Sequence, residues 1–217
     1  MRAATILTAL LAVAAGRAGD PADADRDAKG NAMTSTSTRA WAVRPLANDY
    51  VTIFESPDAR RVLLYSPGIA RLDSGRLVAT MDVRGPRKIL GKWPGAVWER
   101  PGRGDYWQGR VYTSDDGGKT WTLRVRYPFM FARPFVAGDA VYVLGAAGDL
   151  TIIRSTDGGA TWSKPATLTK GDHWHQAPCN VQYAHGNVYL VMERRVTNDV
   201  KTWYVGEVAP VLMRAAV

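Results

Sequence analysis

The sequence predicts an all-β fold assembled from repeated units. Its 217 residues include 8 Trp, 9 Tyr and 4 Phe in short alternating runs, which favour strands over helices. Twenty-one Gly and 12 Pro indicate many tight turns between those runs. One octapeptide occurs twice, and such internal repetition is typical of β-proteins built from successive blades.

Composition limits the class of protein before any motif is considered. Hydrophobic residues make up 46% of the chain and charged residues 22%, which excludes a wholly disordered chain and a multi-span membrane protein. The length suits one all-β domain or two smaller domains. Cys179 is the single cysteine, so an intrachain disulfide and a multi-cysteine metal site are excluded.

The formal net charge of +8 raises the question of an anionic partner. The Lys and Arg residues are scattered along the chain without a basic cluster or stripe, so no nucleic-acid partner is expected. The charge is compatible with anionic small ligands such as acidic sugars. The sequence indicates no oligomeric state.

The N-terminal residues predict a secretory signal peptide. Arg2 precedes an apolar stretch, Ala3 to Gly16, that is short for a membrane span and is followed by small residues. We expect a cleaved signal peptide over residues 1–18, hence a secreted or periplasmic protein without stable membrane insertion; an uncleaved anchor is the alternative. Residues 19–40, rich in Ala, Asp, Ser and Thr, predict a flexible linker before a folded domain over residues 41–217.

The repeated octapeptide follows the pattern Ser-x-Asp-x-Gly-x-Thr-Trp. It runs from Ser114 to Trp121 and again from Ser155 to Trp162, so the two copies start 41 residues apart. Each copy follows a strand-like run and leads into another, which predicts a hairpin turn. In such a turn we expect the Asp to accept hydrogen bonds from turn amides, the Gly pair to take positive φ, and the Trp to pack against the sheet. The motif therefore indicates a structural element, not a catalytic one.

The two octapeptides resemble the Asp-box, also called the BNR repeat, of the sialidase superfamily. That resemblance implies a six-bladed β-propeller with four strands per blade, and the spacing of 41 residues suits one blade. The resemblance extends loosely over residues 62–217. Within that range, the stretch from Tyr65 to Ala79 is similar to the opening inner hairpin of a sialidase.

The strand-like runs group into about three four-stranded blades of the expected six. The first blade takes residues 68–72, 76–82, 106–113 and 121–126. The second takes residues 132–136, 140–144, 149–154 and a short strand from Trp162. The third takes residues 180–184, 187–193, 202–208 and 211–214. The chain therefore looks like an incomplete ring, either the N-terminal portion of a larger protein or a truncated reading frame.

Two carboxylates are candidate catalytic residues. In a propeller, the loops that lead into the innermost strands emerge on the same face as the loops that join the second and third strands of each blade. The resemblance therefore implies that both carboxylates, Asp105 and Glu193, reach this face. Asp105 lies where sialidases place their acid/base aspartate, and Glu193 ends an apolar strand. Burial can raise the pKa of a carboxylic acid until it donates a proton to a leaving oxygen. The alternatives are a turn residue after Gly104 for Asp105, and a local ion pair with Arg194 and Arg195 for Glu193.

Five further residues are candidates for substrate binding. Arg84 is similar to the arginine that ends the second strand of the first sialidase blade, and Arg133 can form a fork of hydrogen bonds to a carboxylate. His173 and His175 alternate across Trp174, whose ring can stack on a sugar. The two histidines have no third ligand nearby in sequence, so we predict no metal and no cofactor. The alternative for Arg84 is an ordinary exposed strand-end arginine, and for Arg133 a surface ion pair with an acidic residue. For residues 173–175 the alternative is a loop packed by its own side chains.

These features predict a secreted, sialidase-like glycoside hydrolase that acts on a terminal sugar, with acidic sugars among the candidates. The alternative is a non-catalytic propeller that binds a glycan or a protein. Tyr65 stands where the family has its first substrate arginine, which favours the alternative.

Overall fold

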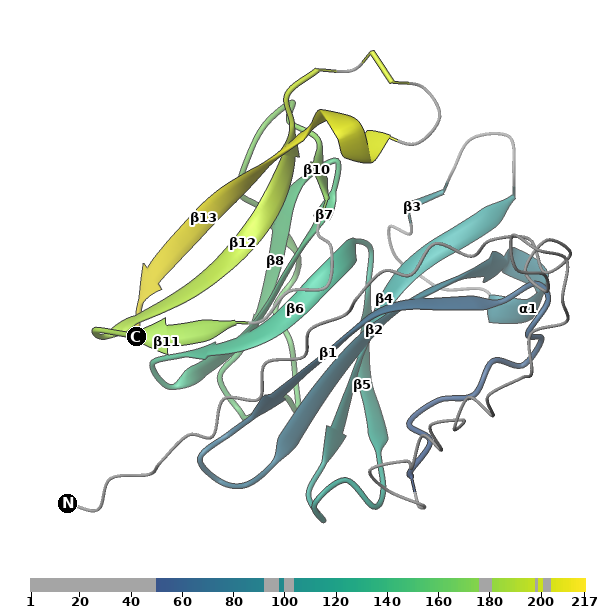
Figure 1. Ribbon diagram of the computed structural model, residues 1–217. Coiled ribbons are helices and arrows are strands. Elements are labelled where there is room, and N and C mark those ends of the chain that lie inside the picture. Colours follow the sequence, from purple (N-terminus) through teal and green to yellow (C-terminus); the bar gives the residue numbers. More distant parts are fainter. Residues whose placement is uncertain (1–49, 92–97, 100–103, 176–180, 198, 201–203) are drawn as a thin grey trace, which may run out of the picture. The chain divides into compact units, whose positions relative to one another are not determined.

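The computed structural model is nearly all β, as predicted, and consists of three antiparallel sheets that follow one another along the chain (Figure 1). It describes residues 50–91, 98–99, 104–175, 181–197, 199–200 and 204–217. The predicted signal peptide, the predicted linker and Cys179 lie outside the described residues. No helix within these ranges is long and apolar enough to cross a membrane.

The first sheet contains the four predicted strands and one more. Its strands are β1 (Leu63–Arg71), β2 (Leu77–Pro86), β3 (Trp98–Glu99), β4 (Asp105–Ser114) and β5 (Thr122–Tyr127). They are ordered β1-β2-β4, and both β3 and β5 pair with the free side of β4. The additional strand, β3, lies in the connection between β2 and β4, which also contains the short helix α1 (Arg87–Leu90).

The second sheet has its strands in simple sequential order. They are β6 (Met130–Ala137), β7 (Ala140–Ala147), β8 (Asp149–Ser155) and β9 (Ala166–Thr167). The fourth strand begins later than predicted, because Trp162 belongs to the octapeptide turn and its indole donates to the carbonyl of Gly159. Apart from this shift, the predicted strand assignments for this sheet are confirmed.

The third sheet departs from the prediction at its C-terminal end. Its strands are β10 (Trp174–His175), β11 (Gln182–Ala184), β12 (Asn187–Arg195) and β13 (Val208–Ala216). β13 pairs with all of β12 on one side, while β10 and β11 share the other side. The predicted strand at 202–208 is wrong, since residues 204–207 form the 3₁₀ turn η1 (Tyr204–Glu207), whereas the predicted strand at 211–214 is confirmed as part of the longer β13. The turn forms because the Glu207 carboxylate accepts hydrogen bonds from the loop that precedes it.

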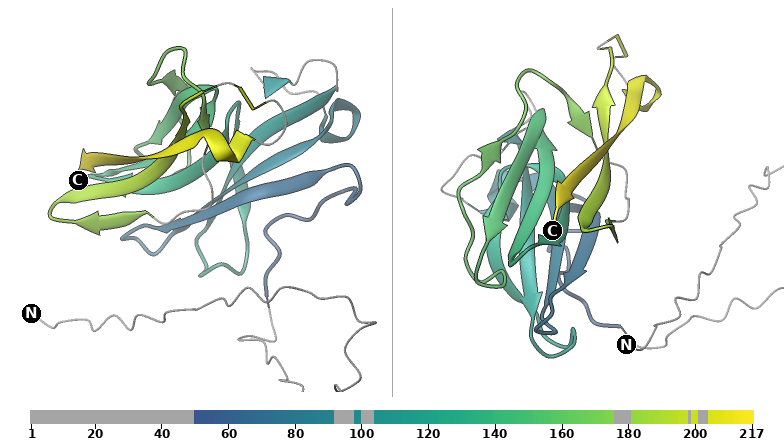
Figure 2. Two further views of the ribbon diagram at one scale, coloured as in Figure 1. Left: turned by 45° about the horizontal axis from the view of Figure 1, so that its top comes forward. Right: turned by 90° about the vertical axis from the view of Figure 1, so that its left-hand side faces the viewer.

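Two hydrophobic cores hold successive sheets face to face (Figure 2). The first core lies between the first and second sheets and contains Val78, Val111, Tyr127, Phe129, Ala132, Val141, Val143 and Ile153. The second lies between the second and third sheets and contains Phe135, Leu144, Ala146, Leu150, Trp174, Val188, Leu190 and Met192. The second sheet is thus buried on both faces, and alternate residues of β7 enter opposite cores. Such stacking of four-stranded sheets is how propeller blades pack, and here the ring is not closed.

The two octapeptide turns have matching hydrogen bonds. Asp116 accepts from the amide and hydroxyl of Thr120 at 2.9 and 2.7 Å, and Asp157 accepts from those of Thr161 at 2.9 and 2.5 Å. The two Gly residues of each turn have positive φ, as the pattern predicts. These bonds lower the pKa of each aspartate well below its usual range. The turns therefore stabilise the hairpins β4–β5 and β8–β9.

Candidate functional site

The inner strands of the first two sheets carry the same irregularity at the same end. β1 is bulged just after Tyr65, and β6 is bulged just after Met130. Within the bulges, Ser66 and Phe131 have φ of 48° and 58°, a region that residues other than glycine seldom occupy. Bulges and strained backbone are common beside functional sites, because they redirect side chains. The two bulges therefore mark this end of the sheets.

Buried charges join the two bulges. The Asp82 carboxylate accepts from the Phe131 amide at 2.7 Å, and Arg133 donates to the carbonyls of Ser66 and Ala132 at 2.9 and 3.0 Å. Asp82 is fully buried and Arg133 is 3% exposed. Burial raises the pKa of Asp82 to about 7, although hydrogen bonds from Phe131 and Ser66 and the charge of Arg133 act in the opposite direction. Asp82 and Arg133 thus hold the bulges in place from beneath.

Arg84 and Asp105 form an ion pair at the ends of β2 and β4. Arg84 donates to one carboxylate oxygen of Asp105 through Nε and Nη2, at 3.2 and 3.0 Å. Its guanidinium lies 4.8 Å from the ring centre of Trp107, which is stacked on Tyr65 at 5.9 Å. Burial alone would lower the pKa of Arg84, but hydrogen bonds to Asp105 and Tyr65 raise it. The pair is one-fifth exposed, so it is accessible to a ligand.

His175 and Glu193 form a second pair, in the third sheet. The two residues are register partners in β10 and β12, and Nδ1 of His175 lies 2.6 Å from a carboxylate oxygen of Glu193. The ring of His175 lies 4.3 Å from the ring of Phe131, in the bulge of β6. Both members of the pair are about one-fifth exposed. Phe131 therefore connects buried Asp82 of the first sheet to this pair.

These contacts form a continuous chain across the three sheets, from Asp105 to Glu193. We call this group the strand-end site and define it as Tyr65, Arg84, Asp105, Trp107, Phe131, His175 and Glu193. It combines two carboxylates, two basic groups and three aromatic rings, all partly exposed. Such a mixture can bind sugar hydroxyls and present aromatic faces to a sugar ring. No cluster of three or more metal-ligating side chains is found among the described residues.

The structure brings four of the seven predicted site residues together and places the other three elsewhere. Arg84, Asp105, His175 and Glu193 lie in the strand-end site. Arg133 lies beneath it and points at backbone carbonyls, so it is not available to fork onto a ligand carboxylate as predicted. Trp174 is 9% exposed in the second core, so its ring offers no stacking face, and His173 is exposed in the loop before β10.

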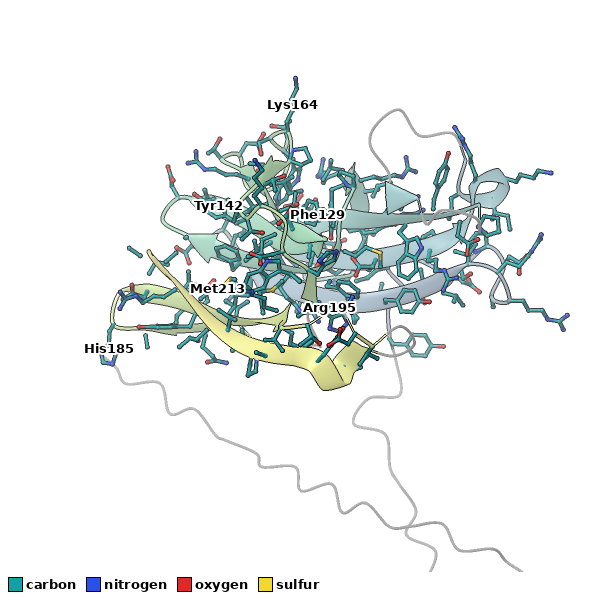
Figure 3. All side chains as sticks on the ribbon, turned by 90° about the horizontal axis from the view of Figure 1, so that it is seen from above. Phe129, Tyr142, Lys164, His185, Arg195 and Met213 are labelled. Carbon is teal, nitrogen blue, oxygen red and sulfur yellow. The ribbon has the colours of Figure 1, made fainter. Side chains whose placement is uncertain are left out.

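The two arginines that follow Glu193, which the sequence offers as partners for a local ion pair, each have an acidic partner elsewhere. Arg194 pairs with Asp172 at 3.3 Å, and Arg195 pairs with Glu207. In Figure 3, Arg195 lies beside η1, and His185 marks the opposite end of β12. Glu193 faces His175, its register partner in β10, whereas the next residue of β12, Arg194, points to the opposite face of the strand.

A groove of about 1010 Å³ runs along the innermost strands β1, β6 and β11. It reaches the bulges, where its lining includes Pro67, Gly68 and Arg133, and it continues to the other end of the sheets at Asp73 and Asp139. None of the seven residues that define the strand-end site lines this groove. The groove therefore leads to the bulges but does not contain the ion pairs.

Phe131 and three other residues of this region were not among the predicted site residues. Asp82 could have been noticed as a charge that directly follows the apolar first half of β2, but its role is clear only once its amide partner in β6 is known. Trp107 and Tyr65 are aromatic residues at strand ends, which are frequent in this chain. Their stacking depends on the register of β1, β2 and β4.

Comparisons with known proteins give structural neighbours only. The sequence matches no protein-family model and no curated protein. The chain is similar to an α-L-arabinanase from Penicillium chrysogenum complexed with arabinobiose, with a TM-score of 0.47, 16% identity, and coverage of 76% of this chain and 50% of that one. It is also similar to an α-L-arabinofuranosidase from Fusarium graminearum in complex with an iminosugar inhibitor (TM-score 0.41, 14% identity, 63% and 42% coverage). A third neighbour is a mutant sialidase from Streptococcus pneumoniae (TM-score 0.38, 17% identity, 68% and 20% coverage). The chain spans half or less of the length of these neighbours, and similarity of this degree carries none of their activities over to it.

Proposed function

We propose that the strand-end site binds a carbohydrate and hydrolyses a glycosidic bond. The observation that carries the proposal is the unbroken chain of contacts that places the Asp105 and Glu193 carboxylates at one end of three sheets. Glycoside hydrolysis is generally performed by two carboxyl groups on either side of the scissile bond. The partly exposed rings of Tyr65 and Trp107 lie beside one of them and suit the apolar face of a sugar.

The two carboxylates differ in their partners, which suggests different roles. Asp105 is ion-paired with Arg84 and is presented as a carboxylate, which suits stabilisation of positive charge on the sugar or activation of a water molecule. Glu193 shares a short contact with His175, a residue that can carry or release a proton. We therefore assign proton donation to the leaving oxygen to the Glu193–His175 pair.

A second candidate function is carbohydrate binding without hydrolysis. Both carboxylates already have basic partners, an arrangement that also fits a rigid set of hydrogen-bonding groups for sugar hydroxyls. The two functions predict different effects of the substitution Glu193→Gln: loss of turnover for hydrolysis, and little change in affinity for binding alone. Hydrolysis requires the proton on this group, whereas binding requires only a hydrogen-bonding side chain of the same size.

The test uses the full chain and a panel of aryl pentosides, hexosides, uronides and sialosides. We expect turnover of at least one member, and a loss of about 10²–10⁴-fold in kcat for Glu193→Gln, which is the usual contribution of acid/base assistance. Exposed Glu55→Gln is the matched control and should keep full activity. Sugar binding without turnover, detected by quenching of Trp fluorescence, would establish the second candidate. Neither turnover nor binding would contradict both.

A further inference from the structure

From the partners of the arginines around the strand-end site, we infer that the site takes a neutral sugar and discriminates against an acidic one. The inference rests on the proposed function, because it names the substrate class of the same site. It departs from the expectation, drawn from net charge, that acidic sugars are compatible ligands. Net charge describes the whole surface, whereas recognition of a carboxylate needs a guanidinium that can turn toward it.

The arginine within the site is already engaged. Both Nε and Nη2 of Arg84 point at Asp105, and these are the atoms with which an arginine forks onto a carboxylate. The ring of Trp107 lies 4.8 Å from the same guanidinium, which also donates a hydrogen bond to Tyr65. An incoming carboxylate would have to displace Asp105, whose own negative charge would then repel it.

Arg133, beneath the site, is oriented away from a ligand. Its Nη1 donates to two backbone carbonyls, its side chain is almost fully buried, and its charge acts on buried Asp82. Turning it outward would break both hydrogen bonds, one of which is buried. Such a loss is costly in a buried setting.

The two arginines that follow Glu193 are also paired. Arg194 meets Asp172 at 3.3 Å, and Arg195 meets the buried carboxylate of Glu207. Arg87, the first residue of α1, lies 5.0 Å from the ring of Tyr106. Tyr106 alternates with Asp105 and Trp107 along β4, so Arg87 is on the opposite face of the first sheet. Within the described ranges, every arginine in or beside the strand-end site therefore already faces an acidic or carbonyl oxygen.

A neutral sugar fits these pairs better than an acidic one. Each sugar hydroxyl can donate and accept a hydrogen bond, so two neighbouring hydroxyls can bond to an arginine and an aspartate at once. A carboxylate only accepts, so it matches the arginine and is opposed by the aspartate. It would also lose water on binding without a compensating charge, which is unfavourable.

The experiment compares matched sugars that differ only at C6: the methyl glycosides of glucose, galactose and mannose, and of the corresponding uronic acids. Binding to the full chain is measured by Trp fluorescence and by ligand-observed NMR at low ionic strength. We expect at least one neutral glycoside to bind about tenfold or more tightly than its uronic counterpart, which corresponds to about 1.4 kcal/mol. Asp105→Asn, which leaves Arg84 without its carboxylate, should shift that ratio toward the uronide by about tenfold.

Asp115→Asn is the matched control. Asp115 pairs with Arg76 at 2.5 and 3.0 Å in turns at the other end of the first sheet, so the substitution makes the same change in net charge away from the site. Its sugar preference should equal that of the wild type. Wild-type binding of a uronide as tightly as its neutral partner would overturn the inference, and so would equal shifts in the two variants. Binding of no sugar at all would instead contradict the proposed function, so the two failures are distinguishable.

Discussion

The Asp82 carboxylate accepts a hydrogen bond of 2.7 Å from the Phe131 amide and thereby ties the second strand of the first sheet to the inner strand of the second. Phe131 has φ of 58°, so its amide points out of the regular ladder and needs a partner from outside its own sheet. The Phe131 ring in turn packs on His175. A buried carboxylate thus holds the backbone of the residue whose ring packs against the His175–Glu193 pair.

The first prediction concerns the pH dependence that Asp82 gives to the fold. Its pKa in the folded state, about 7, lies above the ordinary 3.8, so between pH 4 and 7 the unfolded chain ionises this carboxyl while the fold keeps it protonated. The wild type therefore loses stability as pH rises through that window. Asp82→Asn has no carboxyl to titrate and keeps its stability over this window. The free energy of unfolding of the variant, relative to that of the wild type, should therefore increase from pH 4 to 7 by up to about 4 kcal/mol.

The measurement is urea unfolding at several pH values, with Asp73→Asn in an exposed turn as the control. Because Asn keeps an acceptor for the Phe131 amide, the variant should fold. A stability difference that is constant between pH 4 and 8 would show that Asp82 is ionised in the fold.

The second prediction concerns acid stability and Glu207. Burial alone would raise the pKa of Glu207, but hydrogen bonds from Thr197, Arg195 and the Val200 amide lower it to about 2. The group therefore contributes stability above its ordinary pKa of 4.5, and this contribution is lost as pH falls from about 4.5 to about 2. The Tm of Glu207→Gln should be below that of wild type at pH 7, and the gap should close toward pH 2.

Thermal scans from pH 2 to 7 test this prediction, with Glu55→Gln as the control for loss of one exposed carboxylate. A gap in Tm that does not change with pH would mean that the glutamine loses packing and not charge. That result would contradict the assignment of Glu207 as the ionised centre of the 196–207 loop.

The third prediction concerns the two octapeptide tryptophans. Trp121 and Trp162 take equivalent positions, and each indole donates to the carbonyl of the second Gly in its turn, at 2.9 and 3.0 Å. Both rings are half-buried, less than the full burial that the pattern suggests. Replacement of either by Ala should therefore cost about 2–3 kcal/mol, below the about 3–5 kcal/mol of a fully buried ring. Chemical denaturation measures both, and unequal losses would show that the turns are not equivalent.

The fourth prediction concerns a close approach at Gly109. A Cβ at this position would meet the ring of Tyr127, which is 1% exposed in the first core and cannot move outward. Gly109→Ala should destabilise the protein by about 1–3 kcal/mol through overpacking. Gly206→Ala is the control, because a Cβ there has no neighbour within 4 Å. Equal stability of the two variants would contradict the packing of Tyr127 against β4.

The candidate site was predictable in part, and the successes and failures have a common cause. The sequence places Arg84, Asp105, His175 and Glu193 at strand ends, and strand ends at one edge of stacked sheets lie close together. Whether a side chain at such an end faces a ligand or a core depends on one residue of register. Trp174 and His175 are neighbours, yet the first lies in the second core and the second contacts Glu193.

The sequence alone determined the all-β class, the octapeptide turns and most strand positions of the first two sheets. These are local properties: alternation sets which face of a strand is apolar, and Asp, Gly and Thr within eight residues are enough to form the turn. Only the tertiary structure decided the two bulges, the Asp82–Phe131 bond and the partner of each arginine. These contacts join residues 49 to 67 positions apart or depend on strand register, and no local pattern encodes which buried charge will meet which amide.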